Sequence, residues 1–111
     1  MQILKLEYSH MDKRRTLIQL LTENIQQVNH YKIKRGSILG NHYHKTTKEY
    51  FYITKGTFMV RVADNSFPAT PGTLFLVEPG EKHTLESLTN KSSFMTFLSE
   101  PYDSTRPDLH K

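Results

Sequence analysis

The chain has 111 residues, no cysteine and a formal charge of +4. This length is that of one domain with a modest core, and the lack of cysteine excludes disulfides and thiolate ligands. We expect a cytoplasmic protein without a membrane partner, because no apolar run approaches the roughly 20 residues of a membrane span and the first residues lack a signal-peptide core.

Short runs of alternating residues, separated by Gly and Pro, predict an all-β chain. Taken along the chain, the expected strands are 3–8, 16–21, 28–34, 49–54, 58–63, 74–77, 83–85 and 94–98. Asp64, Asn65 and Ser66 are expected to form a loop, and Pro71-Gly72 and Pro79-Gly80 mark turns. Residues 99–111 are polar and contain two prolines, which predicts a surface tail that is a candidate contact with a partner subunit.

Residues 14–28 fit two interpretations. Leu17, Ile18, Leu21, Ile25 and Val28 also lie on a helical stripe, and the local periodicity alone favours a helix. We nevertheless predict a strand over 16–21, because a family resemblance described below favours it.

Alternation in the strand that begins at Glu49 places Glu49, Phe51 and Ile53 on one face. If that face lines a barrel, the carboxylate lies in an apolar interior. Burying the charge is costly unless a cation or hydrogen bonds compensate for it. In the next strand, Phe58, Val60 and Val62 form one apolar face. The aromatic residues expected in the core are Phe51, Phe58, Phe75, Phe94 and Phe97.

Three metal-competent side chains occur within eight residues. His42 and His44 share a face of an extended strand, Glu49 follows, and His83 is a later fourth candidate. One isolated histidine would be read as an ordinary strand residue, but the set predicts a site for a divalent transition metal. Zn, Ni, Mn, Fe, Co and Cu all remain open, with one or two coordination positions left for water or substrate. His10, in a polar turn, and His30 and His110 are expected to lie outside this site.

The same residues carry a family resemblance. Gly36, His42, His44, Glu49 and Gly56 fit the pattern G-x5-H-x-H-x4-E-x6-G, which is the first motif of the cupin superfamily. The second motif, G-x5-P-x-G-x2-H-x3-N, matches at Gly72, Gly80 and His83, but Glu78 replaces its proline and Ser87 its asparagine. The resemblance implies a jelly-roll β-barrel of two antiparallel sheets with the metal inside, near one mouth. It also implies a homodimer to which residues 1–21 contribute.

Two narrower resemblances bear on function. Residues 40–45, GNHYHK, resemble the R-G-x-H-A-H-K pattern of dTDP-sugar ketoisomerases, although Leu39 replaces the arginine and Glu49 stands where those enzymes tend to have glutamine. Residues 40–44 also resemble the zinc-binding cupin domain attached to a capsule-sugar reductase, which epimerises a keto sugar nucleotide. The chain has no G-x-G-x-x-G strand and hence no nicotinamide site of its own.

These resemblances imply a metal-dependent isomerase or epimerase that acts on a keto sugar or sugar nucleotide in surface-carbohydrate biosynthesis. The metal would polarise the carbonyl, and the base would be His42 or His44 if not metal-bound, or Tyr43 or Tyr50. Two alternatives remain open: an iron-dependent cupin dioxygenase and a non-catalytic sugar-binding module.

The positive charge suits an anionic small-molecule substrate. Lys45 and Arg61 are candidate substrate-binding residues. The basic residues around the first motif either attract such a substrate or are simply solvated; they are Lys32, Lys34, Arg35, Lys45 and Lys48. We do not expect a nucleic-acid partner, because the sequence has no helix-turn-helix or zinc-finger pattern.

Overall fold

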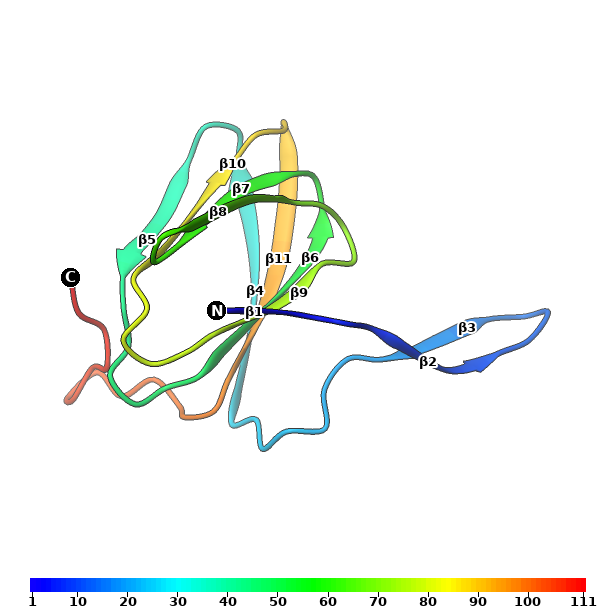
Figure 1. The fold of residues 1–111 in the computed structure, drawn as a ribbon, viewed down its shortest axis with the longest axis horizontal. Helices are drawn as coiled ribbons and strands as arrows, with labels where there is room; N and C mark the ends of the chain where they lie inside the picture. Colours follow the sequence, from blue (N-terminus) through cyan, green and yellow to red (C-terminus); the bar gives the residue numbers. More distant parts are fainter.

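The computed structural model describes the backbone of residues 1–111 and all side chains except those of residues 7–9. Two antiparallel sheets face each other, and a two-stranded hairpin projects from them (Figure 1). The described backbone consists of strands, turns and irregular segments without a helix, so the all-β prediction is confirmed. In particular, the backbone of residues 1–111 contains no helix that could cross a membrane.

The strands form three sheets in which every pair is antiparallel. The five-stranded sheet has the order β1 (Gln2–Leu4), β9 (Leu74–Val77), β6 (Glu49–Lys55), β11 (Lys91–Leu98) and β4 (Gln27–Lys34). The four-stranded sheet has the order β5 (Ile38–His42), β10 (His83–Ser87), β7 (Phe58–Val62) and β8 (Asn65–Ala69). The hairpin pairs β2 (Glu7–Met11) with β3 (Thr16–Gln19).

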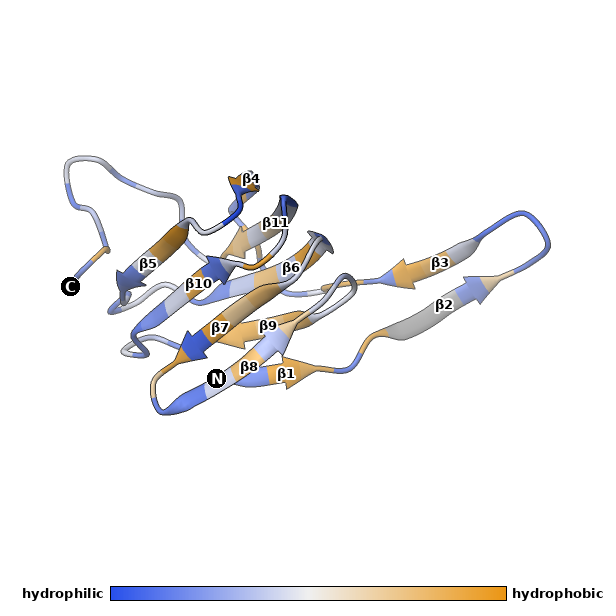
Figure 2. Cartoon of the chain, turned by 90° about the horizontal axis from the view of Figure 1, so that it is seen from above, coloured by the Kyte–Doolittle hydropathy of each residue, from blue (hydrophilic) through white to orange (hydrophobic). Residues whose placement is uncertain are grey.

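The core lies between the two larger sheets, where the inward faces of β6 and β7 meet. Phe51 and Ile53 on β6 are buried together with Phe58, Val60 and Val62 on β7, as the alternation predicts. Apolar residues dominate β7 and β9 in Figure 2. Full burial of one such side chain contributes about 1.5–3 kcal/mol, so this layer fixes how the sheets face each other.

A second apolar cluster covers the outer face of the five-stranded sheet. Tyr50, Leu74 and Leu76 are buried there, and Leu21 and Ile25 pack against them. Residues 16–19 pair with β2 rather than forming a helical turn, so the strand prediction for this region is confirmed, although the strand ends at Gln19. The helical spacing of Leu21 and Ile25 reflects packing on this sheet.

Two strands were missing from the expected ranges. The prediction that His42 and His44 share one extended strand is wrong, because β5 ends at His42. β5 contains Gly40 and Asn41, both with positive φ, which resemble turn residues in the sequence. β8 begins inside the expected loop 64–66 and contains Pro68, which is tolerated because β8 is an edge strand. The expected strand 3–8 is instead two strands, β1 and β2. His10 lies in β2 rather than in a turn; the turn follows at residues 12–15.

Candidate metal centre

The four predicted ligands come from three strands and one loop and converge between the sheets. His42 ends β5, His44 follows it in a loop, Glu49 begins β6 and His83 begins β10. One ligand atom from each of the four side chains lies within 4.8 Å of the other three. Nitrogen and oxygen ligands bind first-row metals at about 2.0–2.2 Å, so atoms around one ion lie about 3–4 Å apart. The cluster is therefore compact enough for a single cation.

Gly40 allows β5 to approach β10 where the cluster forms. Its φ is +98°, and a Cβ atom at this position would lie 2.6 Å from the carbonyl oxygen of His83. A larger residue would push the strands apart at the pair His42–His83, which are cross-strand partners. The left-handed backbone of Asn41, at φ 59°, adds a bend. The rings of His42 and His44 therefore meet, with centroids 5.2 Å apart, although His44 lies beyond the strand.

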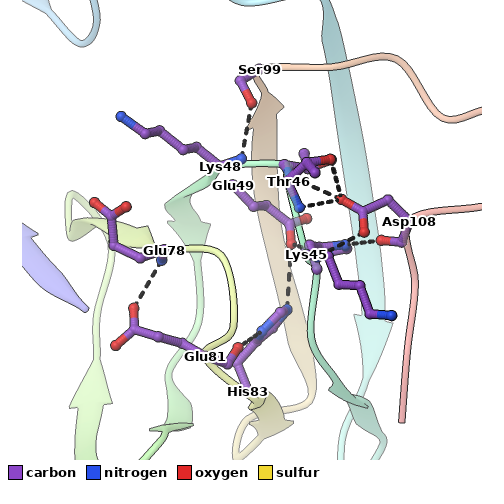
Figure 3. A network of polar contacts seen from close by, with 11 residues as sticks. Lys45, Thr46, Lys48, Glu49, Glu78, Glu81, His83, Ser99 and Asp108 are labelled. Atoms are coloured by element: carbon purple, nitrogen blue, oxygen red, sulfur yellow. Dashed lines mark hydrogen bonds and ion pairs between the residues drawn. The ribbon is translucent and has the colours of Figure 1, made fainter.

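His83 presents an unpaired nitrogen to the cluster. Its side chain is buried, and Nδ1 donates a hydrogen bond of 3.0 Å to the Glu81 carbonyl oxygen (Figure 3). This contact leaves the Nε2 lone pair free. Among the described residues Nε2 has no hydrogen-bond partner, and it lies 3.4 Å from Oε1 of Glu49. A buried nitrogen without a hydrogen-bond partner is uncommon, and its position in the cluster is suited to binding a metal ion.

His44 is held from both sides of its ring. Nδ1 donates to the Asp108 carbonyl oxygen at 2.5 Å, and Nε2 lies 3.0 Å from Oε1 of Glu49. Burial opposes a positive charge on this ring, but the hydrogen bonds to Glu49 and Asp108 outweigh it and raise the pKa of His44. Without a metal, a proton on Nε2 thus occupies the place of a cation between the imidazole and the carboxylate.

The electrostatics of the other two ligands favour metal binding. Burial alone would raise the pKa of Glu49, but His44 and His83 outweigh it and lower the pKa to about 2. Burial, together with the nearby His83 and His44, lowers the pKa of His42 to about 4. At neutral pH Glu49 is therefore charged and His42 has a free lone pair, which are the forms that bind a metal.

A cavity of about 170 Å³ extends from the cluster into the space between the sheets. His42, Glu49 and His83 line one side, and its walls are mostly apolar, with Leu39, Phe51, Leu85 and Phe94 contributing. A wider groove of about 660 Å³ shares Tyr31, His42 and Glu49 with the cavity and also borders His44. The cluster therefore borders both the smaller cavity and the larger groove.

A family model described as "Cupin domain" matches residues 29–98, more than half of the chain and all four residues of the cluster. The chain belongs to the cupin family. Among curated protein sequences, none gives a significant match.

Solved structures share the cupin fold at low sequence identity. The Staphylococcus aureus capsular polysaccharide assembling protein CapF has a TM-score of 0.70 and 22% identity, and the alignment covers 96% of this chain and 34% of CapF. The Mycobacterium tuberculosis rmlC epimerase has a TM-score of 0.78 and 19% identity, and the alignment covers 94% of this chain and 65% of the epimerase. The QdtA 3,4-ketoisomerase of Thermoanaerobacterium thermosaccharolyticum, in complex with TDP, has a TM-score of 0.79 and 20% identity, and the alignment covers 97% of this chain and 84% of QdtA. This cupin thus spans only about a third of CapF.

The other residues singled out in the sequence lie away from the cavity. Tyr43 forms a backbone bridge with His110, and Tyr50 is buried in the cluster on the outer face of the five-stranded sheet. The Lys45 side chain is exposed. Arg61 is about half exposed and lies 3.7 Å from Glu86 in an ion pair.

Two residues that sequence analysis did not single out line the cavity. Tyr31 stacks on Phe94, with ring centroids 4.8 Å apart. Thr96 is fully buried, and its Oγ1 has no hydrogen-bond partner among the described residues. Alternation offered a signal for both, because Tyr31 shares a strand face with Ile33 and Thr96 shares one with Phe94.

Proposed function

We propose that this cupin binds a divalent transition metal through His42, His44, Glu49 and His83, and that it isomerises or epimerises a keto sugar or sugar nucleotide. The observation that carries the proposal is the buried Nε2 of His83, which faces Glu49 without a hydrogen-bond partner. The similar structures support the choice of substrate class. Two are named as an epimerase and a 3,4-ketoisomerase, and a third assembles capsular polysaccharide.

The donor set fits such a metal. Three imidazole nitrogens and one carboxylate oxygen suit Zn, Fe, Ni, Mn, Co or Cu, and a site with four protein ligands leaves one or two positions open. When bound, the metal would supply a Lewis acid that polarises the carbonyl of the substrate. Glu49 contributes the negative charge that balances part of the charge of the ion.

The dimensions and walls of the cavity suit the proposed substrate. A cavity of about 170 Å³ accommodates a group the size of one sugar ring, and the groove of about 660 Å³ leaves room for a nucleotide. Leu39, Phe51 and Phe94 exclude water from the ring, which limits loss of a reactive enediolate to solvent. Thr96 Oγ1 offers a hydrogen bond to a sugar hydroxyl or carbonyl within this apolar wall.

Proton transfer beside the carbonyl needs an acid and a base near the cavity. His42, His44, Tyr43 and Tyr50 are the bases considered from sequence. Of these, His42 and His44 border the groove, but as metal ligands they have no free lone pair and would act as bases only in a metal-free site. Tyr31 is an additional candidate. Its ring lines the cavity. Burial and the nearby Glu49 raise its pKa, so the hydroxyl is suited to donate a hydrogen bond to a substrate oxygen and is a weaker acid than an exposed tyrosine.

The proposal extends to the closure of the barrel, the oligomeric state and the cellular location. We propose that the two sheets close into a jelly-roll barrel, that residues 1–21 join a neighbouring subunit in a homodimer, and that the protein is cytoplasmic. Exposed Ile3 on β1 and exposed Met11 and Leu17 on the projecting hairpin are surfaces that such a neighbour would cover. A variant lacking residues 1–21 that stays a dimer would argue against the role of this segment, and a wild-type protein that is a monomer in solution would contradict the homodimer itself.

Hydrogen exchange in deuterated water tests the reaction. The metal-loaded protein is incubated with a panel of keto sugars and keto sugar nucleotides, and deuterium uptake is measured by mass spectrometry and NMR. We expect uptake at the carbon beside the carbonyl, its loss in His83→Gln, and its retention in the control His10→Gln, which changes a histidine in the remote hairpin.

Three results would contradict the proposal in distinguishable ways. A metal-loaded protein that catalyses no exchange with any member of the panel would exclude the proposed reaction. Oxygen consumption by the iron-loaded protein would instead favour the dioxygenase alternative. Tight binding of a sugar that is recovered unchanged would favour a binding module.

A further inference from the structure

The C-terminal segment folds back against the loop that joins two of the candidate ligands. This loop, residues 45–47, lies between His44 and Glu49. The Asp108 carboxylate accepts hydrogen bonds from the backbone N–H groups of Lys45, Thr46 and Thr47, at 2.7, 2.9 and 2.9 Å (Figure 3). It also accepts the hydroxyl groups of Thr46 and Thr47, both at 2.9 Å. One side chain therefore contacts five donors in three consecutive residues, and it shares one of them, the Thr46 hydroxyl, with Glu100 Oε2 at 3.0 Å.

The main chain of the same segment contacts the ligand itself. The carbonyl oxygen of Asp108 accepts the Nδ1–H of His44, 64 residues earlier in the sequence. Two residues further on, His110 and Tyr43 exchange backbone hydrogen bonds of 2.8 and 2.9 Å. Residues 108–110 thus fix the chain on both sides of His44 and the ring of His44 at the same time.

We propose that Asp108 is a positioning residue for His44: its carboxylate fixes the loop 45–47, and its carbonyl holds the imidazole with Nδ1 protonated and Nε2 facing Glu49. This inference deepens the proposed function and rests on its metal site. A ring nitrogen can bind a metal only through its lone pair, and the hydrogen bond made by the other nitrogen sets the tautomer and the ring orientation. His83 obtains the same arrangement locally, from Glu81. His44 has no such neighbour in the described part of its own loop and obtains it from the C-terminal segment.

The alternative is that Asp108 only fastens the tail. Two readouts distinguish the roles: the Nδ1–H resonance of His44 in the metal-free protein, observed by NMR, and the zinc dissociation constant. The variants are Asp108→Ala and the more conservative Asp108→Asn, which keeps one acceptor oxygen. The matched control is Asp103→Ala. In the same tail Asp103 accepts the N–H and hydroxyl of Thr105 at 2.9 and 2.7 Å, and these contacts lie outside the cluster.

In the wild-type protein we expect a protected, downfield Nδ1–H signal from His44. Asp108→Ala should lose this signal through exchange with water and bind zinc about 10- to 100-fold more weakly, the range for groups that orient metal ligands. Asp108→Asn should bind zinc with an affinity between those of Asp108→Ala and the wild type. Asp103→Ala should match the wild type in both the Nδ1–H signal and the zinc dissociation constant.

The inference is overturned if folded Asp108→Ala or Asp108→Asn protein keeps the Nδ1–H signal and binds zinc within twofold of the wild type. A wild-type protein that binds no metal would contradict the proposed function instead. The signal of His44 in the metal-free protein would then still decide whether Asp108 positions the ring. If Asp108→Ala does not fold, Asp108→Asn provides the same two measurements.

Discussion

Strand β10 has a buried polar residue at each end, and the two ends differ in how their polar atoms are paired. At its last residue, Ser87 Oγ lies 2.8 Å from Ser92 Oγ and 3.0 Å from the Thr89 carbonyl oxygen. The Thr89 hydroxyl lies 2.7 Å from Ser92 Oγ and accepts the Thr57 N–H. At its first residue, the buried Nε2 of His83 has no hydrogen-bond partner in the described part of the chain.

The comparison separates a structural polar cluster from a candidate binding site. Both ends bury polar atoms in the same space between the sheets, so burial alone does not identify a site. The Ser87 end satisfies its donors and acceptors internally and leaves nothing for a ligand. At the His83 end, Nε2 lies 3.4 Å from Oε1 of Glu49 without a hydrogen-bond partner in the described residues and borders a cavity, a state that is costly unless another species completes it.

The largest expected effect concerns metal affinity at the His83 end. Glu49→Gln and His83→Gln should each weaken zinc binding by at least about 1,000-fold, or about 4 kcal/mol, because groups that merely orient ligands already account for 10- to 100-fold. Ser87→Ala, on the same strand, should bind zinc within twofold of the wild type. Competition with a chelator of known affinity measures all three. If Ser87→Ala weakened zinc binding as much as His83→Gln, the two ends of β10 would not differ in the way described.

The next effect concerns backbone packing beside the Ser87 cluster. A Cβ at Gly56 would lie 2.4 Å from Thr89 Oγ1 and 2.5 Å from Ser92 Oγ, and the residue has a φ of +75°. Gly56→Ala should therefore lower the free energy of unfolding by about 2–4 kcal/mol through strain and overpacking. Gly72→Ala is the matched control, since φ is +91° but nothing lies within 4 Å of the added atom. It should cost only about 1–2 kcal/mol. Urea unfolding of both variants checks this, and equal costs would refute the close packing.

A smaller effect separates a paired hydroxyl from an unpaired one. Ser87→Ala removes a partner from Ser92 and should destabilise the protein by about 1 kcal/mol. Thr96→Val removes a buried hydroxyl that has no partner, at nearly constant shape, and should be neutral or stabilising by up to about 1 kcal/mol. Urea unfolding of the metal-free variants measures both. A clear destabilisation by Thr96→Val would show that its hydroxyl is paired.

The smallest effect is the pH dependence of the metal-free protein. An unfolded histidine titrates near pH 6.5 and His42 at about 4. Protons therefore bind the unfolded chain preferentially below pH 6.5, and stability falls as the pH drops to 4. Because solvent screens this half-buried ring, the loss should total only about 1 kcal/mol. His42→Gln should remove this loss of stability. Ser87→Ala should keep the wild-type dependence of the free energy of unfolding on pH, as measured by urea unfolding at several pH values.

Two other groups of the cluster, Glu49 and His44, also contribute to the pH dependence of stability, and their contributions have opposite signs. The pKa of Glu49 is lowered to about 2, so its stabilising effect is complete above pH 4.5 and is lost as the pH falls toward 2. The pKa of His44 is raised, so its contribution is complete below pH 6.5 and is lost as the pH rises through its folded value. An unchanged slope between pH 6.5 and 4 in His42→Gln would contradict the assignment to His42.

Local patterns predicted much of the structure around β6 and β7. Period-two alternation placed Phe51 and Ile53, and also Val60 and Val62, on the buried faces, because packing between sheets selects apolar residues at every second position. Motif spacing indicated which side chains converge, since it is tied to the order of strands in the cupin fold. Whether the converged residues hold a metal stays a prediction.

Local patterns failed where tertiary contacts decide the conformation. Gly40 reads as a turn residue, yet it lies in β5 because only glycine permits the close approach to the His83 carbonyl. Asp108 lies more than 60 residues from the loop that it contacts, and no local pattern links the two. Alternation signalled which faces of their strands Tyr31 and Thr96 occupy, but it could not show that these faces line a cavity, because that depends on which strand faces pair between the sheets.

A crystal structure of the protein supplied with zinc, with anomalous diffraction data collected across the zinc edge, tests the central claim most directly. We expect one strong anomalous peak per chain, about 2.0–2.2 Å from a nitrogen atom of His42, His44 and His83 and from a carboxylate oxygen of Glu49. The account is contradicted if no peak appears among these four side chains while zinc is present in the crystal.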